Sequence, residues 1–465
     1  MQASNTGPAA ASDGRDSTPF DGVHLFALAV LFSMNMLNYI DRYSFFAVGS
    51  HIQRELGIGD FRYGVLSAAF MIVYTLVSPL MGWLGDRYNR RVLLAFGVGL
   101  WSVATVGTAF SRGFADMFCW RALLGVGEAT YGVIAPALLA DLFAPKHRGR
   151  VMGVYFLALP LGGAVGYATG GYVADAWHWR ASFWVVGLPG LLAAAAAFLI
   201  RDPGRGASEG HAGASRPNPS GWNDYVEILR TPTFLYNTAG LAAVTFVSGA
   251  YAAWGSTFYQ SVRGLTASRA GTLIGGLTAL AGLVGIVLGT VLGDVLSRFT
   301  RRAYLLMAGL AVSAAIAPGL LGMLETRPNV SLAFLFGAMV PMAMVLGPCN
   351  TVTANVVPAS RRATGYAISI FMIHLFGDIS SPILIGLLSQ ELGKPYFAAS
   401  SLGRFFQSVG ATPVGDTNLT AAMLSVVPVM ALAALLFFIG TRYLPRDQER
   451  AQATGGGEAG GPVYH

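Results

Sequence analysis

Twelve runs of mainly apolar residues, each about as long as a membrane helix, constrain this chain more than any other feature. Because the hydrocarbon core of a bilayer is about 30 Å thick, a spanning helix needs about 20 such residues. We expect helices at 23–48, 61–83, 92–111, 115–140, 149–173, 181–200, 233–258, 268–292, 303–324, 330–356, 363–388 and 418–442. Only 11% of the residues are charged, whereas soluble domains carry about 25%. The sequence therefore predicts an all-α integral membrane protein.

A polar break divides the expected helices six and six. Residues 201–232 are rich in Gly, Pro, Ser and charge, and we interpret them as a linker with a short amphipathic piece around Trp222 to Leu229. A second long loop, 389–417, precedes the last helix. The expected organisation is a tail at 1–22, a six-helix half at 23–200, the linker, a second six-helix half at 233–442 and a tail at 443–465.

Lys and Arg are distributed unevenly between the two sides of this expected bundle. The side with both termini holds 19 of the 30, the other side holds nine, and Arg42 and Arg121 lie within helices. Since cytoplasmic loops carry an excess of Lys and Arg, we expect both termini in the cytoplasm and the protein in the cell (inner) membrane. Topology thus explains the net charge of +7, and we expect no nucleic-acid partner.

The first expected helix carries Asn38, Asp41 and Arg42, and the fourth carries Arg121 and Glu128. Ionisable groups at bilayer depth are costly, so they face a protein interior or a watered cavity and usually mark a pathway. On a helix, Asn38 lies one turn from both Asp41 and Arg42, which themselves point about 100° apart. Either a functional site or a buried structural ion pair explains these residues.

A loop motif occurs twice, each time after the second helix of a half. The first copy contains Gly82, Gly85, Asp86, Arg87, Arg90 and Arg91, and the second, looser copy contains Asp294 and Arg298. Two matching six-helix halves indicate a parallel duplication, and transporters of this design bind substrate where the halves meet.

The first loop closely resembles the signature loop of the major facilitator superfamily. Within it, Asn38-Tyr-Ile-Asp41-Arg42 and Gly125-Val-Gly127-Glu128-Ala-Thr-Tyr131 look like the spinster branch. The resemblance implies alternating access between two halves related by a pseudo-twofold axis, proton coupling, and export of sphingosine-1-phosphate or lysophospholipids. It implies no catalysis and no cofactor, with a proton gradient as energy source.

By the same resemblance, the first and fourth helices of each half line a central cavity, where Asp41 and Glu128 would meet. Two carboxylates in a low-dielectric cavity resist being ionised together, so we expect them to carry protons. We expect Arg42 to bind an anionic head group, because guanidinium grips phosphate or carboxylate in bidentate fashion. Asn38, Arg121 and Tyr131 complete the expected substrate site. The structural alternative is an ion pair, Arg42–Glu128 or Arg121–Asp41.

The first loop is also, by resemblance, a latch that clamps the halves on the cytoplasmic side while the carrier faces out. Asp141, at the cytoplasmic end of the fourth helix, is placed to pair with one of the loop arginines. Anchoring by positive charge alone would explain these arginines but not Asp86 or the two glycines.

Several other residues have ordinary structural explanations. His374 and Asp378, spaced i,i+4, form either a second proton site or, as we favour, a structural hydrogen bond. Cys119 and Cys349 form neither a disulfide framework nor a metal set. Pro160, Pro341 and Pro348 are expected to allow bending. Five glycines of 149–173 are expected to allow close packing, namely Gly162, Gly163, Gly166, Gly170 and Gly171.

The seventh and tenth expected helices carry no charge but many aromatic and Met residues, some of which must face inward. These are Phe234, Tyr236, Phe246, Tyr251, Trp254, Phe334, Phe336, Met339, Met342 and Met344. A cavity charged on one wall and apolar on the other suits an amphiphilic anion. We therefore expect a monomeric, proton-coupled carrier of such a molecule. A carrier of small organic anions or drugs is the alternative, and a receptor without transport is a remote one.

Overall fold

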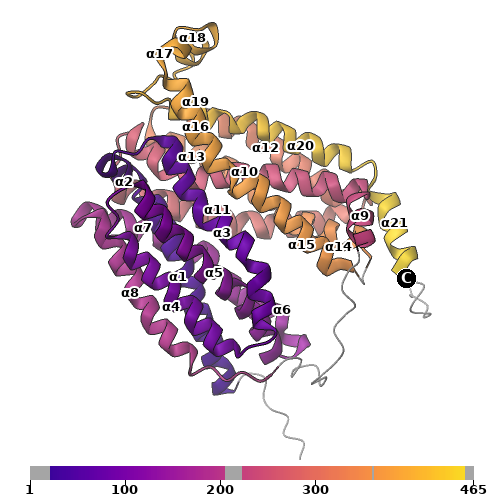
Figure 1. Cartoon of the computed structure of the whole chain (residues 1–465). Coiled ribbons are helices and arrows are strands. Elements are labelled where there is room, and N and C mark those ends of the chain that lie inside the picture. Colours follow the sequence, from indigo (N-terminus) through magenta and orange to yellow (C-terminus); the bar gives the residue numbers. More distant parts are fainter. Residues whose placement is uncertain (1–20, 205–221, 359–360, 456–465) are drawn as a thin grey trace, which may run out of the picture.

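The computed structural model describes residues 21–204, 222–358 and 361–455, which form a helical bundle (Figure 1). Parts of the expected tails (1–20 and 456–465), residues 205–221 of the expected linker, and residues 359–360 lie outside the described residues. The described part of the chain contains no strand, only an isolated bridge between Val414 and Thr417.

The first half contains eight helices, and most of the remaining helices lie in the second half. The first eight are α1 (Gly22–Ala47), α2 (Gly49–Leu56), α3 (Asp60–Gly85), α4 (Arg90–Thr108), α5 (Phe114–Leu142), α6 (Pro145–Phe156), α7 (Ala158–Ala176) and α8 (Trp179–Ala197). The short helix α9 (Trp222–Leu229) matches the expected amphipathic piece before the second half. The second half then contains α10 (Pro232–Ser261), α11 (Ala267–Ser297), α12 (Ala303–Leu324), α13 (Pro328–Met344), α14 (Leu346–Val356), α15 (Arg362–Ile373), the π-helix η3 (His374–Asp378), α16 (Ser380–Gly393), α17 (Pro395–Ala398), α18 (Ser401–Ser408), α19 (Leu419–Leu424), α20 (Val426–Gly440) and α21 (Leu444–Gly455).

Eleven helices or joined helices of the described chain are long and apolar enough to cross a membrane. The twelfth span is α10, which has 30 residues but is less apolar, since it carries Asn237, Thr238, Ser256 and Thr257. Other helices bury all four of these side chains. The prediction of an all-α membrane protein with twelve spanning helices is confirmed.

Four of the expected spans are interrupted, and each interruption lies four residues before a proline. The preceding segments α6, α13, η3 and α19 end at Phe156, Met344, Asp378 and Leu424, and the prolines are Pro160, Pro348, Pro382 and Pro428. Proline has no N–H with which to bond the carbonyl four residues earlier, and its ring clashes with that carbonyl. A proline does not always interrupt a helix, however, since Pro79, Pro136, Pro189, Pro318 and Pro341 lie inside continuous helices.

The two halves pack tightly at one end of the bundle, which we call the α2 end. Glycines bring their backbones together there: a Cβ added to Gly271 of α11 would lie 2.2 Å from the Tyr167 carbonyl oxygen of α7. Likewise, a Cβ on Gly64 of α3 would lie 2.2 Å from the Pro382 carbonyl oxygen of α16. Toward the other end, which carries α6, α9 and α21 and which we call the linker end, the halves diverge (Figure 1).

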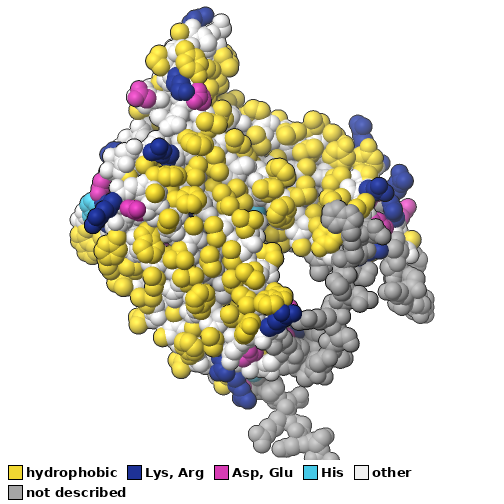
Figure 2. Space-filling model, in the orientation of Figure 1, with side chains coloured by type: hydrophobic (Ala, Val, Ile, Leu, Met, Phe, Trp, Pro, Cys, Tyr) yellow, Lys and Arg dark blue, Asp and Glu magenta, His cyan; other side chains and the backbone are white. Residues whose placement is uncertain are grey.

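Hydrophobic side chains cover the flank of the bundle that Figure 2 shows, whereas Lys, Arg, Asp and Glu gather toward its two ends. Such a band is the surface that a bilayer requires. The view also shows the molecule hollowed between the halves toward the linker end. One loop prediction was wrong: α16 continues to Gly393, and α17 and α18 form a projecting hairpin within 389–417. Its apolar residues, such as Phe397 and Phe406, pack on each other with ring centroids 6.3 Å apart.

Candidate functional site

An ion pair between α1 and α5 lies at the centre of the first half. Arg42 Nη2 lies 2.6 Å from Glu128 Oε2, and the Glu128 side chain is 1% exposed, against 17% for Arg42. The Arg42 guanidinium also packs on the ring of Phe70 at 4.6 Å and on that of Tyr39 at 5.4 Å. The structure therefore contains the Arg42–Glu128 pair, which is one of the two ion pairs that the sequence left open.

Asp41 points away from this pair, as a difference of about 100° between adjacent helical residues requires. Its carboxylate accepts a hydrogen bond from the Thr105 hydroxyl of α4, and its other oxygen, Oδ1, is buried without a partner among the described residues. The structure thus separates the two carboxylates, Asp41 and Glu128, onto different neighbours.

Arg121 is as deeply buried as Glu128, since only 1% of it is exposed. Its guanidinium stacks on Phe45 at 4.0 Å and on Phe70 at 4.8 Å, and Nε donates to the Leu66 carbonyl at 3.4 Å. Within the described chain it forms no ion pair, so the alternative pairing with Asp41 is absent in this conformation. Two aromatic faces replace a counter-ion here.

The charged cluster is under-satisfied. Four buried polar atoms have no hydrogen-bond partner in the described structure: Asp41 Oδ1, Arg42 Nε, Arg121 Nη2 and Glu128 Oε1. Buried polar atoms without partners are rare in native proteins, and each needs an explanation. A proton, a water molecule or a ligand group would satisfy these four atoms.

Asn38 and Tyr131 flank the cluster on the side toward the linker end. Asn38 is buried one turn before Arg42. The Tyr131 hydroxyl donates to the Leu31 carbonyl of α1 at 2.5 Å, and its ring meets that of Trp101 edge to face at 5.3 Å. In this conformation Tyr131 therefore ties α5 to α1, whereas its expected contact with substrate stays a prediction.

An apolar cavity of about 280 Å³ lies across from the cluster, in the second half. Tyr251 of α10 and Met339 and Met342 of α13 line it, as does Tyr43, the residue after Arg42. Because Tyr43 belongs to α1, the apolar cavity begins next to the charged wall. Of the aromatic and Met residues expected to face inward, these three from α10 and α13 do so.

The first loop motif lies at the linker end, between α3 and α4. Arg90 Nη1 lies 2.5 Å from Asp141 Oδ2, so the expected partner acid contacts one of the loop arginines. The Arg87 guanidinium stacks on Trp83 at 4.0 Å. Gly82 and Gly85 let α3 approach α5, since a Cβ on Gly85 would lie 3.1 Å from Ile134.

The remaining motif residues are more exposed. Asp86 is exposed and makes no ion pair with any residue that the structure describes, and the Arg91 N–H donates to the Asn89 side chain at 3.0 Å. In the second copy, Asp294 accepts from the Tyr304 hydroxyl at 3.3 Å, and the exposed Arg298 follows the end of α11. Their role as a latch stays a prediction.

His374 and Asp378 contact each other in the middle of their span. His374 Nδ1 lies 2.9 Å from Asp378 Oδ2, and both side chains are about a quarter exposed. They are the first and last residues of η3, and π-helical turns occur frequently at functional sites. The contact is the predicted i,i+4 pair. Its role, as a structural hydrogen bond or as a second proton site, stays a prediction.

Several residues of the site had not been identified from the sequence. Thr105 is a single hydroxyl in an apolar run, and threonines in membrane helices commonly bond their own backbone, as Thr105 also does with Trp101. Phe45 and Phe70 are ordinary members of an apolar pattern. Only the relative rotation of four helices, α1, α3, α4 and α5, reveals that Thr105 contacts Asp41 and that the two phenylalanines contact Arg121.

Comparisons with known proteins agree with this geometry. The family model described as Major Facilitator Superfamily matches residues 31–382. Over 446 residues the chain is 33% identical to protein spinster homolog 1 of Rattus norvegicus, covering 91% of this chain and 82% of the relative. It is 32% identical over 457 residues to protein spinster homolog 3 of Danio rerio, covering 94% and 88%.

Solved structures share the fold. A bacterial homologue of the human lysosomal transporter spinster, in an inward-facing and unoccupied conformation, matches with a TM-score of 0.79 at 23% identity, covering 92% of this chain and 99% of that one. A D-xylose–proton symporter matches with a TM-score of 0.66 at 15% identity, covering 88% and 97%. The chain therefore belongs to the Major Facilitator Superfamily of membrane transporters, within the family of the spinster proteins.

Proposed function

We propose that this transporter is a proton-coupled carrier of an amphiphilic anion, of the lysolipid or sphingosine-phosphate type. The observation that carries the proposal is the asymmetry of the central region. Arg42, Glu128, Asp41 and Arg121 lie in the first half, whereas the cavity of about 280 Å³ in the second half is lined mainly by apolar and aromatic groups. A molecule with an ionic head and an alkyl tail matches both walls.

Proton coupling is the second part of the proposal. Arg42 is bound to Glu128, and an anionic head group would compete with Glu128 for the same guanidinium. A displaced carboxylate in a low-dielectric site would take up a proton. Substrate binding and protonation of Glu128 would then favour each other, with Asp41 as a second carrier.

We also propose the direction of the molecule in the membrane. The linker end would face the cytoplasm of the inner membrane, and the closed α2 end would face outward, because the linker end holds most of the Lys and Arg. In the same proposal the carrier works as a monomer. The pair Arg90–Asp141 and the exposed Asp86 would form the cytoplasmic latch in the outward-facing state.

Binding of a series of lysophospholipids with increasing tail length tests the substrate class. Each buried CH₂ contributes roughly 0.8 kcal/mol, so the Kd should fall about fourfold per methylene until the cavity is full. Arg42→Ala should weaken binding of anionic heads much more than of neutral heads with the same tail. Binding that is indifferent to tail length would refute the lipid assignment and favour a carrier of small organic anions or drugs.

A further inference from the structure

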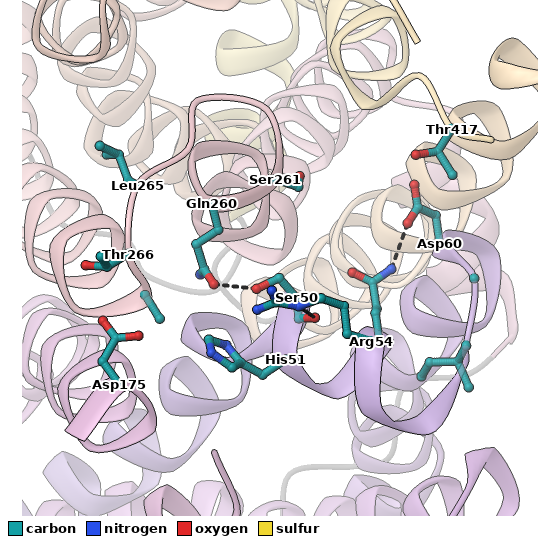
Figure 3. A pocket seen from close by; sticks show the side chains of 14 residues that line it. Ser50, His51, Arg54, Asp60, Asp175, Gln260, Ser261, Leu265, Thr266 and Thr417 are labelled. Atoms are coloured by element: carbon teal, nitrogen blue, oxygen red, sulfur yellow. Dashed lines mark hydrogen bonds between the residues drawn. The ribbon is translucent and has the colours of Figure 1, made fainter. Parts of the chain in front are cut away.

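The closed α2 end contains a cavity of about 540 Å³ between the two halves (Figure 3). Ser50, His51 and Asp175 line it from the first half, and Gln260 and Thr266 from the second. In Figure 3 the ring of His51 lies between Ser50 and Asp175, and Gln260 points across to Ser50. The cavity therefore lies at the seam that must open when a transporter exposes its centre to this side.

Neutral hydrogen bonds close most of this seam. Gln260 Nε2 donates to the Ala47 carbonyl at 2.8 Å, the Ser50 hydroxyl donates to Gln260, and the Tyr167 hydroxyl donates to the Ala252 carbonyl at 2.5 Å. Such bonds between neutral groups contribute about 0.5–1.5 kcal/mol each. They hold the halves together but respond weakly to charge.

One bond across the seam is different. The Ser268 N–H, in the first turn of α11, donates to Asp175 Oδ2 of α7 at 2.6 Å. Thr266 already caps the same helix by accepting from the Arg269 N–H at 3.2 Å. A carboxylate of one half thus meets the positive end of a helix dipole in the other. The other acid at this seam, Asp60, lies beside Ser389 of the second half but accepts its 2.7 Å hydrogen bond from Gln53 of its own half.

We propose that Asp175 is the latch of the α2 end: its carboxylate caps α11 across the seam and holds this end closed. The crossing beneath it is formed by glycines and backbone atoms, such as Gly171 against the Ala267 carbonyl, and offers no side chain that could be charged or released. Opening the seam breaks the Asp175–Ser268 bond and leaves both groups to water. Removal of the carboxylate therefore raises the fraction of molecules open at the α2 end.

The test uses two cysteine probes in a Cys119→Ala, Cys349→Ala background, labelled with a soluble maleimide in nanodiscs. Thr257→Cys, which is 3% exposed at the seam, reports opening of the α2 end. Leu346→Cys, which is 40% exposed and lines the central apolar cavity, reports access from the linker end. Asp175→Ala should raise the labelling rate of Thr257→Cys by about two- to fivefold, which is the effect of a carboxylate at a helix N-terminus. The same change should lower the labelling rate of Leu346→Cys.

Glu55→Gln is the matched control. Glu55 is an acid at the same end, but its partners Trp179 and Arg180 lie in its own half. Glu55→Gln should leave the labelling rates of both cysteine probes unchanged. Asp175→Asn keeps an acceptor oxygen but no charge, so it should give a labelling rate at Thr257→Cys between those of the parent and Asp175→Ala. Unchanged labelling in Asp175→Ala would overturn the proposal. So would a rise at both probes, or an equal effect of Glu55→Gln, because either indicates general loosening.

Discussion

At the scale of single residues, the Arg42–Glu128 pair makes proton coupling testable. Glu128→Gln keeps the size of the side chain and an acceptor for Arg42, but it cannot exchange a proton. We expect pH-driven accumulation in proteoliposomes to be lost, while exchange of substrate at equal pH continues. Glu325→Gln, which changes a surface acid bound to Arg327, is the control. Accumulation by Glu128→Gln at the rate of the parent would exclude Glu128 as the proton carrier.

The same residues show what the sequence can and cannot predict. Asp41, Arg42, Arg121 and Glu128 stand out because charges in apolar helices are rare, and the structure brings all four into one region. Their pairing could not be predicted, since it depends on helix rotation that no local pattern encodes. Thr105 was missed for a related reason: a threonine becomes the partner of Asp41 only through its place in space.

At the scale of elements, the crossing of α7 and α11 predicts a steric effect with a built-in control. An added Cβ at Gly271 would meet the Tyr167 carbonyl oxygen, whereas one at Gly276 on the same helix would meet nothing within 4 Å. Gly271→Ala should lower the free energy of unfolding by about 1–3 kcal/mol, as overpacking does. Gly276→Ala should not, because Ala is the better helix former.

Thermal unfolding of both variants in nanodiscs checks this. Equal midpoints for Gly271→Ala and Gly276→Ala would mean that the backbones do not approach as closely as described. Most glycines of α7 pack closely, as the sequence indicated: Gly162, Gly163, Gly166 and Gly170 lie against α1 of the same half. Gly171 lies against Ala267 of α11 in the other half, a neighbour that could not be inferred from the sequence. The prolines were partly informative: each of the four interruptions precedes a proline, but prolines such as Pro136 and Pro341 lie inside continuous helices.

At the scale of the whole molecule, acid on the α2 side should favour opening of that end. Burial lowers the pKa of His51 below its ordinary value of 6.5, and the nearby Arg54 and His178 lower it further. The acids Asp175 and Glu55 raise this pKa, but by less. A histidine with a lowered pKa destabilises the closed form once the pH falls below 6.5, because the open, solvated form binds the proton more readily. The closed end is therefore fully stable above this pH and loses stability as the pH falls through the lowered value.

Spin labels at Trp177→Cys and Tyr396→Cys, one in each half, measure this by pulsed electron resonance. Acidification from about one unit above to about one unit below the ordinary histidine pKa should increase the long-distance population. His51→Gln should remove the increase. A response that persists in His51→Gln would assign the pH dependence to another group.

The polarity of α10 has a consequence for how the protein is made. The Asn237 amide donates to the Cys349 carbonyl and to Thr353, and the Thr238 hydroxyl donates to Ser369, so their partners lie later in the second half. During synthesis α10 emerges before these partners, and a helix less apolar than the other spans partitions less readily from the insertion machinery into lipid. Its entry into the bilayer therefore waits for the more apolar α11 and α12, so the second half is delivered to the membrane as a group of helices rather than one at a time.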